Sequence, residues 1–275
     1  MIQRWVLSRE LELWQDAGRQ VALWWRDDDA RIPTAQLDRL LKLARRYETP
    51  LTLAAVPDWD RSGLAARLAC ERQVMVIQHG VDHQNAAGGQ GPKAEFPVRY
   101  PREVMETRLV EARERLSVMS RFAAVFAPPW NHVHPALNGA LRASGYSGLS
   151  AFGEDMSHER GFTRLDVHLS LLGDCGERPF AGADSFIARF AKLLRERRRT
   201  GRWDQPIGLQ THHLDHDEAA WRGLEDFLDH TTRSAAIGWT SINQLLAGEG
   251  VLRPADAGLA VDRVAKSAGR GRVRI

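Results

Sequence analysis

Four groups of polar residues follow short apolar stretches of the chain, each at the point where the apolar stretch ends. The groups are Asp27–Asp29, His79, Pro129–Trp130–Asn131 and His212–His213. Aspartate and histidine side chains bind divalent metals and transfer protons. One such group could arise by accident, but four are harder to explain that way. Their shared position therefore predicts a catalytic site.

His79 and His83 are four residues apart in the segment His-Gly-Val-Asp-His. This spacing brings both imidazoles to one side of a helical turn or a tight loop, where their nitrogens can meet one ion. Many surface helices carry two histidines at this spacing, so the pair by itself is weak evidence. Its place directly after an apolar stretch favours a metal site.

Asp27, Asp28 and Asp29 bring three negative charges together at the end of the first apolar stretch. Like charges at this distance repel one another, and a bound cation would remove that penalty. A solvated acidic turn that caps the following helix is the alternative. One carboxylate with His79 and His83 would leave metal positions open for water and substrate, as in catalytic sites. A second carboxylate would remain free to accept a proton from water.

We therefore expect one divalent metal ion as the cofactor. Imidazole and carboxylate ligands suit zinc, and also cobalt, nickel or manganese. Such an ion would acidify a water molecule and polarise a carbonyl group. His212 and His213 follow an apolar stretch, and strand alternation would turn them to different sides. One of them would then act as the acid that protonates the leaving group, and the other would have a structural role.

The elements that must position these residues alternate along the chain. Apolar runs predict strands at 21–25, 51–56, 73–78, 123–126, 147–152, 207–211 and 237–240. Helical patterns follow at 33–47, 63–70, 102–119, 135–144, 184–199, 217–230 and 241–246. This alternation predicts an α/β protein with a parallel sheet, open or closed into a barrel, whose carboxyl edge carries the site. Residues 154–182 show no clear pattern.

The composition is typical of a globular protein: 275 residues, 43% hydrophobic, 27% charged, with a net charge of +3. We expect one catalytic domain over 1–250 and a basic, disordered tail over 251–275. No basic stripe interleaved with aromatic residues suggests nucleic-acid binding. No leader or run of about 20 apolar residues suggests a membrane, so a cytoplasmic protein is expected. Serine hydrolases and nucleotide enzymes are disfavoured because their glycine-containing motifs are missing.

The motifs resemble those of the polysaccharide deacetylase family, the NodB-homology domain of carbohydrate esterase family 4, in a divergent branch. The family's first motif, Thr-Phe-Asp-Asp-Gly, is loosely matched by 25–29, and its second, His-Ser/Thr-x-x-His, by 79–83. Its fifth motif, Leu-x-x-His, is matched by 209–212. The segment 237–245 is similar to the family's last strand and helix. The resemblance covers roughly residues 20–247.

This resemblance implies a distorted (β/α) barrel of about seven parallel strands, with a metal that is usually zinc. It implies removal of an acetyl group from an N-acetylated sugar or polysaccharide. By position, Asp27 would be the base, Asp28 a metal ligand with His79 and His83, and His212 the acid. Related branches use an Asp-x-Asp arrangement, which would make Asp29 the ligand instead. The three consecutive aspartates allow either Asp28 or Asp29 to be the metal ligand.

The sequence departs from the family in its third and fourth motifs. The third has an arginine that orients the base, and here that place is taken by Ala127, so Arg26 is a candidate substitute. The fourth motif is not recognisable. For substrate binding the sequence offers Pro129, Trp130, Asn131 and His213, and Trp130 could stack on a sugar or stabilise an oxyanion through its N–H.

Two other functions fit the same scaffold. One is hydrolysis of a small non-sugar amide or ureide, which would need a different pocket. The other is a non-catalytic carbohydrate-binding protein on a decayed enzyme. The aspartate triplet argues against decay, because both a metal ligand and a candidate base survive in it. The expected partner is thus a carbohydrate or another small molecule, with no nucleic acid and no membrane.

Overall fold

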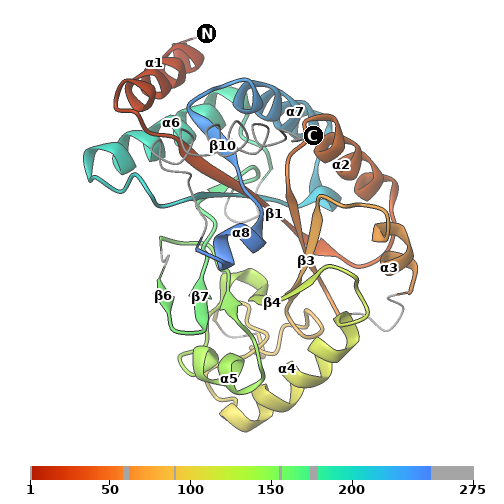
Figure 1. Ribbon diagram of the computed structural model, residues 1–275. Coiled ribbons are helices and arrows are strands. Elements are labelled where there is room, and N and C mark those ends of the chain that lie inside the picture. The colour runs from red at the N-terminus through yellow and green to blue at the C-terminus, as the bar shows by residue number, and fades with distance from the viewer. Residues whose placement is uncertain (1, 58–61, 90, 155–156, 174–178, 249–275) are drawn as a thin grey trace, which may run out of the picture.

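The computed structural model describes residues 2–57, 62–89, 91–154, 157–173 and 179–248 (Figure 1). Its strands are β1 (Val21–Ala30), β2 (Leu51–Ala55), β3 (Val74–His79), β4 (Phe122–Ala127), β5 (Gly148–Leu149), β6 (His158–Glu159), β7 (Phe162–Arg164), β8 (Leu169–Ser170), β9 (Ile207–Thr211) and β10 (Ile237–Trp239). Its α-helices are α1 (Ile2–Asp16), α2 (Ala35–Arg46), α3 (Ser62–Leu68), α4 (Arg102–Leu116), α5 (Leu137–Ala143), α6 (Ala183–Arg199), α7 (Glu218–Thr232) and α8 (Ile242–Leu246). Two 3₁₀ turns, η1 (Pro129–Asn131) and η3 (His213–Asp215), follow β4 and β9.

Within the described ranges these strands form one sheet in the order β6-β7-β5-β4-β3-β2-β1-β9-β8, and β10 also pairs with β1. Every pairing is parallel except that of β6 with β7. The sheet curls into an incomplete barrel with helices around its outside (Figure 1). The predicted distorted (β/α) barrel is therefore confirmed.

The long strand β1 organises the barrel, because it pairs with β2, β9 and β10. Trp24 and Trp25 are both fully buried, and strand alternation sends them to opposite faces. Trp25 packs in the layer between the sheet and the outer helices. Trp24 packs on the other face, with residues of β2, β3 and β4 and with Ile242 of α8. The strand is thus anchored on both sides before it reaches the aspartates.

The outer helices cover the sheet with their apolar faces. In α2 the buried face consists of Leu37, Leu40, Leu41, Leu43 and Ala44. The helix begins after Thr34, whose hydroxyl accepts a hydrogen bond from the N–H of Leu37. Within the described ranges, each helix is too short or too polar to span a lipid bilayer.

Two parts of the fold were not anticipated. Helix α1 packs against α6 and buries Leu7, Leu11 and Trp14. These residues have helical spacing, but no helix was predicted for this segment. The unclear region 154–182 contains β6, β7 and β8, which are only two or three residues long. Alternation cannot be detected over so few residues. The predicted tail, 251–275, lies outside the described residues.

Gly208 offers a test of this packing, because it lies in β9 opposite Trp24 and against its indole ring. A Cβ at this position would lie 2.6 Å from Trp24 Nε1 and 2.8 Å from the Cα of Val167. Since a backbone atom cannot swing aside, we expect Gly208→Ala to lower the free energy of unfolding by about 1–3 kcal/mol. Chemical denaturation followed by circular dichroism measures this change.

The matched control is Gly63→Ala in α3. A Cβ there would meet the Pro33 Cδ at 3.5 Å, an ordinary contact, so no loss of stability is expected. Equal stability of Gly208→Ala and the wild-type protein would contradict the close packing of β9 on Trp24.

Candidate metal centre and active site

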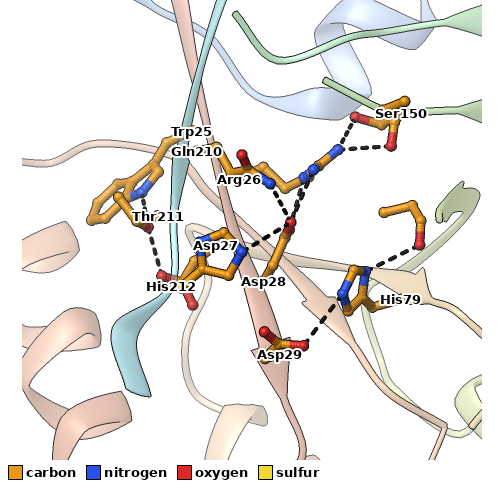
Figure 2. A network of polar contacts seen from close by, with 12 residues as sticks. Trp25, Arg26, Asp27, Asp28, Asp29, His79, Ser150, Gln210, Thr211 and His212 are labelled. Atoms are coloured by element: carbon orange, nitrogen blue, oxygen red, sulfur yellow. Dashed lines mark hydrogen bonds and ion pairs between the residues drawn. The ribbon is translucent and has the colours of Figure 1, made fainter. Parts of the chain in front are cut away.

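The carboxyl ends of β1, β3, β4 and β9 meet around one pocket of about 640 Å³. Residues that line it include Asp28, Asp29, His79, His83, Trp130, Asn131, Phe152, Ser170, Arg189, Gln210, His212 and Asp215. Figure 2 shows how the aspartates of β1 point in different directions from successive positions of one strand. The pocket is therefore built at the edge of the barrel that the sequence predicts.

Asp29 lies beside the two histidines of the His-Gly-Val-Asp-His segment. Its Oδ1 is 3.3 Å from His79 Nε2 and 3.1 Å from His83 Nε2. These three side chains can each offer one ligand atom, all within 4.8 Å of one another. Ligand atoms in a tetrahedral zinc site lie about 3.3–3.5 Å apart, given bonds of about 2.0–2.2 Å. The donor set and its spacing fit one divalent metal ion.

Hydrogen bonding prepares His79 for this role. Its Nδ1 lies 3.0 Å from the carbonyl oxygen of Ala127. Because a carbonyl only accepts, Nδ1 donates to it, and Nε2, which faces Asp29, is the nitrogen that would bind a metal on losing its proton. Burial acts to raise the pKa of Asp29, but the hydrogen bonds to His79 and His83 outweigh burial and hold that pKa well below its ordinary value.

Asp28 is buried and held by a different set of partners. Arg26 donates from Nε to Asp28 Oδ1 at 2.8 Å and from Nη2 to Oδ2 at 2.9 Å. Gln210 donates to Oδ2 at 2.7 Å. His212 Nε2 lies 3.9 Å from the same Oδ2, on the pocket side. Burial would raise the pKa of Asp28, but the positive charge of Arg26 opposes it, and the net pKa is lowered.

Arg26 is itself fully buried and fixed on its far side. Its Nη1 donates to the carbonyl oxygen of Ser150 at 2.7 Å and to the Ser150 hydroxyl at 2.6 Å (Figure 2). A planar guanidinium that grips one carboxylate with two donors fixes the orientation of that carboxylate. Arg26 therefore orients Asp28, which lies two residues further along the same strand.

Asp27 points away from the pocket into a buried network. It accepts hydrogen bonds from the Thr211 hydroxyl at 2.6 Å and from the His213 N–H at 3.1 Å. Its Oδ1 also lies 2.5 Å from His213 Nδ1. Trp25 Nε1 completes the chain by donating to Thr211 Oγ1 at 2.8 Å. Neither Asp27 nor His213 lines the pocket.

Most of the residues expected at the site do meet there. Asp28, Asp29, His79, His83, His212, Trp130 and Asn131 all line the pocket. Pro129 instead packs against Gly80. A Cβ added to Gly80 would lie only 2.6 Å from the Cγ of Pro129. Trp130 packs against the ring of His83, with 4.7 Å between the centroids. Asp27 and His213 stand behind the site, joined to each other.

The backbone at the site is held in an uncommon conformation. Asp29, His83, Trp130 and Asn131 have positive φ values of 70°, 57°, 53° and 54°. Among the described non-glycine residues, only Glu48 shares this feature. Such conformations cost energy and persist where the surroundings enforce them, most often at functional sites. Here they turn Asp29 and His83 toward each other.

Glu95 enforces the conformation around His83, and the sequence gave no sign of it. Its buried carboxylate accepts hydrogen bonds from the backbone N–H groups of Val81, Asp82 and His83 at 2.7–3.0 Å. Gly80 has a φ of 64°, and a Cβ there would lie 2.7 Å from Glu95 Oε1. The contact spans a loop of more than ten residues, so no local pattern could reveal it. Arg189 and Asp215 also line the pocket without having been predicted.

We expect Glu95→Gln to lower the free energy of unfolding by about 1–3 kcal/mol, because the amide cannot accept from all three N–H groups. Hydrogen exchange at residues 81–83 should accelerate in the same variant. Glu103→Gln, on the exposed surface of α4, is the matched control. Unchanged exchange at 81–83 in Glu95→Gln would contradict the role of this carboxylate.

No protein-family model matches the sequence, and no curated protein matches it either. Several solved structures match the fold. One is a protein of Mycobacterium smegmatis described as a candidate polysaccharide deacetylase, with 14% identity, a TM-score of 0.65, and coverage of 86% of this chain and 93% of that one. A candidate polysaccharide deacetylase from Pseudomonas aeruginosa PAO1 has 11% identity, a TM-score of 0.64, and coverage of 84% and 91%.

A third similar structure is a family 4 acetyl xylan esterase from Clostridium thermocellum in complex with a cobalt ion. It is 13% identical, has a TM-score of 0.54, and the match covers 85% of this chain and 95% of that one. The chain thus has the NodB-like fold of polysaccharide deacetylases and family 4 carbohydrate esterases. The resemblance seen in the motifs is confirmed at the level of the fold.

Proposed function

We propose that the protein is a metal-dependent hydrolase that removes the acetyl group from an N-acetylated sugar. The observation that carries this proposal is the pairing of two units at one pocket: the ligand set of Asp29, His79 and His83, and the oriented carboxylate of Asp28. A metal set alone could be structural. A second carboxylate in the same pocket, held by Arg26 rather than by the metal ligands, provides a base.

Asp29, His79 and His83 would hold the metal, in the Asp-x-Asp register that the sequence left open. When bound, a divalent ion supplies Lewis-acid chemistry that lowers the pKa of water and polarises a carbonyl. The cobalt ion bound to the Clostridium thermocellum esterase supports a metal of this class. Zinc remains our first choice, with cobalt, nickel and manganese as alternatives.

Asp28 is the proposed base. Its orientation is fixed by Arg26 and Gln210, and its lowered pKa keeps it ionised at neutral pH. As water attacks the acetyl carbonyl carbon, Asp28 accepts the proton that water loses. A carboxylate already held by two hydrogen-bonding partners needs little rearrangement to do this, which is the benefit of a preorganised site.

His212 is the proposed acid. Its Nε2 faces the pocket 3.9 Å from Asp28, so the base and the acid flank the same space. When the C–N bond breaks, His212 would donate a proton to the departing nitrogen, which leaves as the free amine beside acetate. Behind it, Asp27 bonds the backbone N–H of His213 and fixes the turn that carries His212.

The proposal is tested by acetate release. Protein reconstituted with zinc or cobalt is expected to release acetate from N-acetylglucosamine oligomers, and chelation of the metal should abolish the activity. An enzyme-coupled acetate assay measures both. Asp28→Asn should lower kcat by about 10²–10⁴-fold because it removes the base while the metal ligands remain.

Asp16→Asn, on the exposed end of α1, is the matched control and should keep full activity. If Asp28→Asn retained wild-type kcat, Asp28 would not be the base. If the metal-loaded protein released no acetate from any N-acetylated sugar, the deacetylase proposal would fail, and hydrolysis of small amides or ureides would be examined next.

A further inference from the structure

Arg189 of α6 lines the catalytic pocket and lacks an acidic partner among the residues that the structure describes. It comes from the helix after β8, a part of the chain that the proposed chemistry does not use. Its guanidinium lies 5.5 Å from the centroid of the Phe186 ring, one turn earlier in α6, which helps to hold it in place. A fixed positive charge therefore faces the space where substrate would bind.

This arginine differs from the two fully buried arginines of the described chain. Arg26 binds Asp28, and Arg197 lies 3.1 Å from Glu154. Arg189 is half-buried, and burial lowers its pKa with no neighbouring carboxylate to offset the effect. A guanidinium remains charged at any physiological pH, so Arg189 carries a desolvation cost that no described residue compensates.

The carboxylates that line the pocket interact with groups other than Arg189. Asp28 is paired with Arg26, and Asp29 faces the two histidines. Asp215 lines the pocket too, but its pKa is raised, first by burial, and Arg189 is not among the groups that oppose this rise. Among the described residues, no carboxylate of the pocket pairs with Arg189, and its guanidinium is open to a group that enters the pocket.

We propose that Arg189 binds an anionic group of the substrate, a carboxylate or a phosphate, so that the protein acts on acidic N-acetylated sugars in preference to neutral ones. This inference rests on the proposed deacetylase function. A guanidinium presents two parallel donors that match the oxygens of either anion, and such paired hydrogen bonds are among the strongest in proteins. Arg189 would thus be a specificity-determining residue in the same pocket as the proposed catalytic residues.

Three probes share one acetamido sugar and differ in their charge: N-acetylglucosamine, N-acetylmuramic acid with a carboxylate, and N-acetylglucosamine 6-phosphate. Their affinities are measured by calorimetry with the full-length Asp28→Asn protein, so that bound sugar is not consumed. Either the carboxylate or the phosphate probe should bind roughly 10–100-fold more tightly than N-acetylglucosamine. The preferred probe identifies the source of the anion.

Arg189→Gln, added to the same protein, should remove that preference. Arg199→Gln is the matched control, because it makes the same charge change on an exposed position of α6 outside the pocket, and it should retain the preference. Equal affinities for all three probes in the presence of Arg189, or a preference that survives Arg189→Gln, would overturn the inference. Binding is measured without turnover, so a failed acetate assay would refute the proposed function without deciding this point.

Discussion

Three adjacent carboxylates at the end of β1 must avoid one another, and the site depends on how they do so. Strand alternation and the positive φ of Asp29 send the three side chains to three separate partners. Asp27 bonds to His213, Asp28 to Arg26, and Asp29 faces His79 and His83. The repulsion that would make the triplet costly is therefore replaced by three local attractions. Each carboxylate acquires a different environment and, as we propose, a different task.

The buried pair of Arg26 and Asp28 ties this arrangement to the barrel. A buried charge without a partner is strongly destabilising, whereas a well-bonded pair is tolerated. Arg26 reaches Ser150, just after β5, while Gln210 of β9 completes the bonding of Asp28. The orientation of the proposed base thus depends on strands from opposite sides of β1. The curled sheet brings these strands together, so the fold and the site cannot be separated energetically.

The sequence was most informative where a signal is local. Strand β9 was predicted at its observed bounds, and the helix predicted over 33–47 is found as α2. His79 and His83 were paired by their spacing together with their position after an apolar stretch. The sequence could not choose between Asp28 and Asp29 as the ligand, because the direction of each carboxylate depends on partners distant in sequence and on the positive φ of Asp29. It also could not reveal Glu95 or Arg189, since both reach the site through contacts distant in sequence.

The central claim is that Asp29, and not Asp28, completes the metal site with His79 and His83. The most direct measurement is the zinc content of wild type, Asp28→Asn and Asp29→Asn by elemental analysis, after reconstitution and removal of free metal. We predict about one equivalent in the wild type and in Asp28→Asn, and a large loss in Asp29→Asn. Stoichiometric zinc in Asp29→Asn together with its loss in Asp28→Asn would contradict the account and identify Asp28 as the metal ligand.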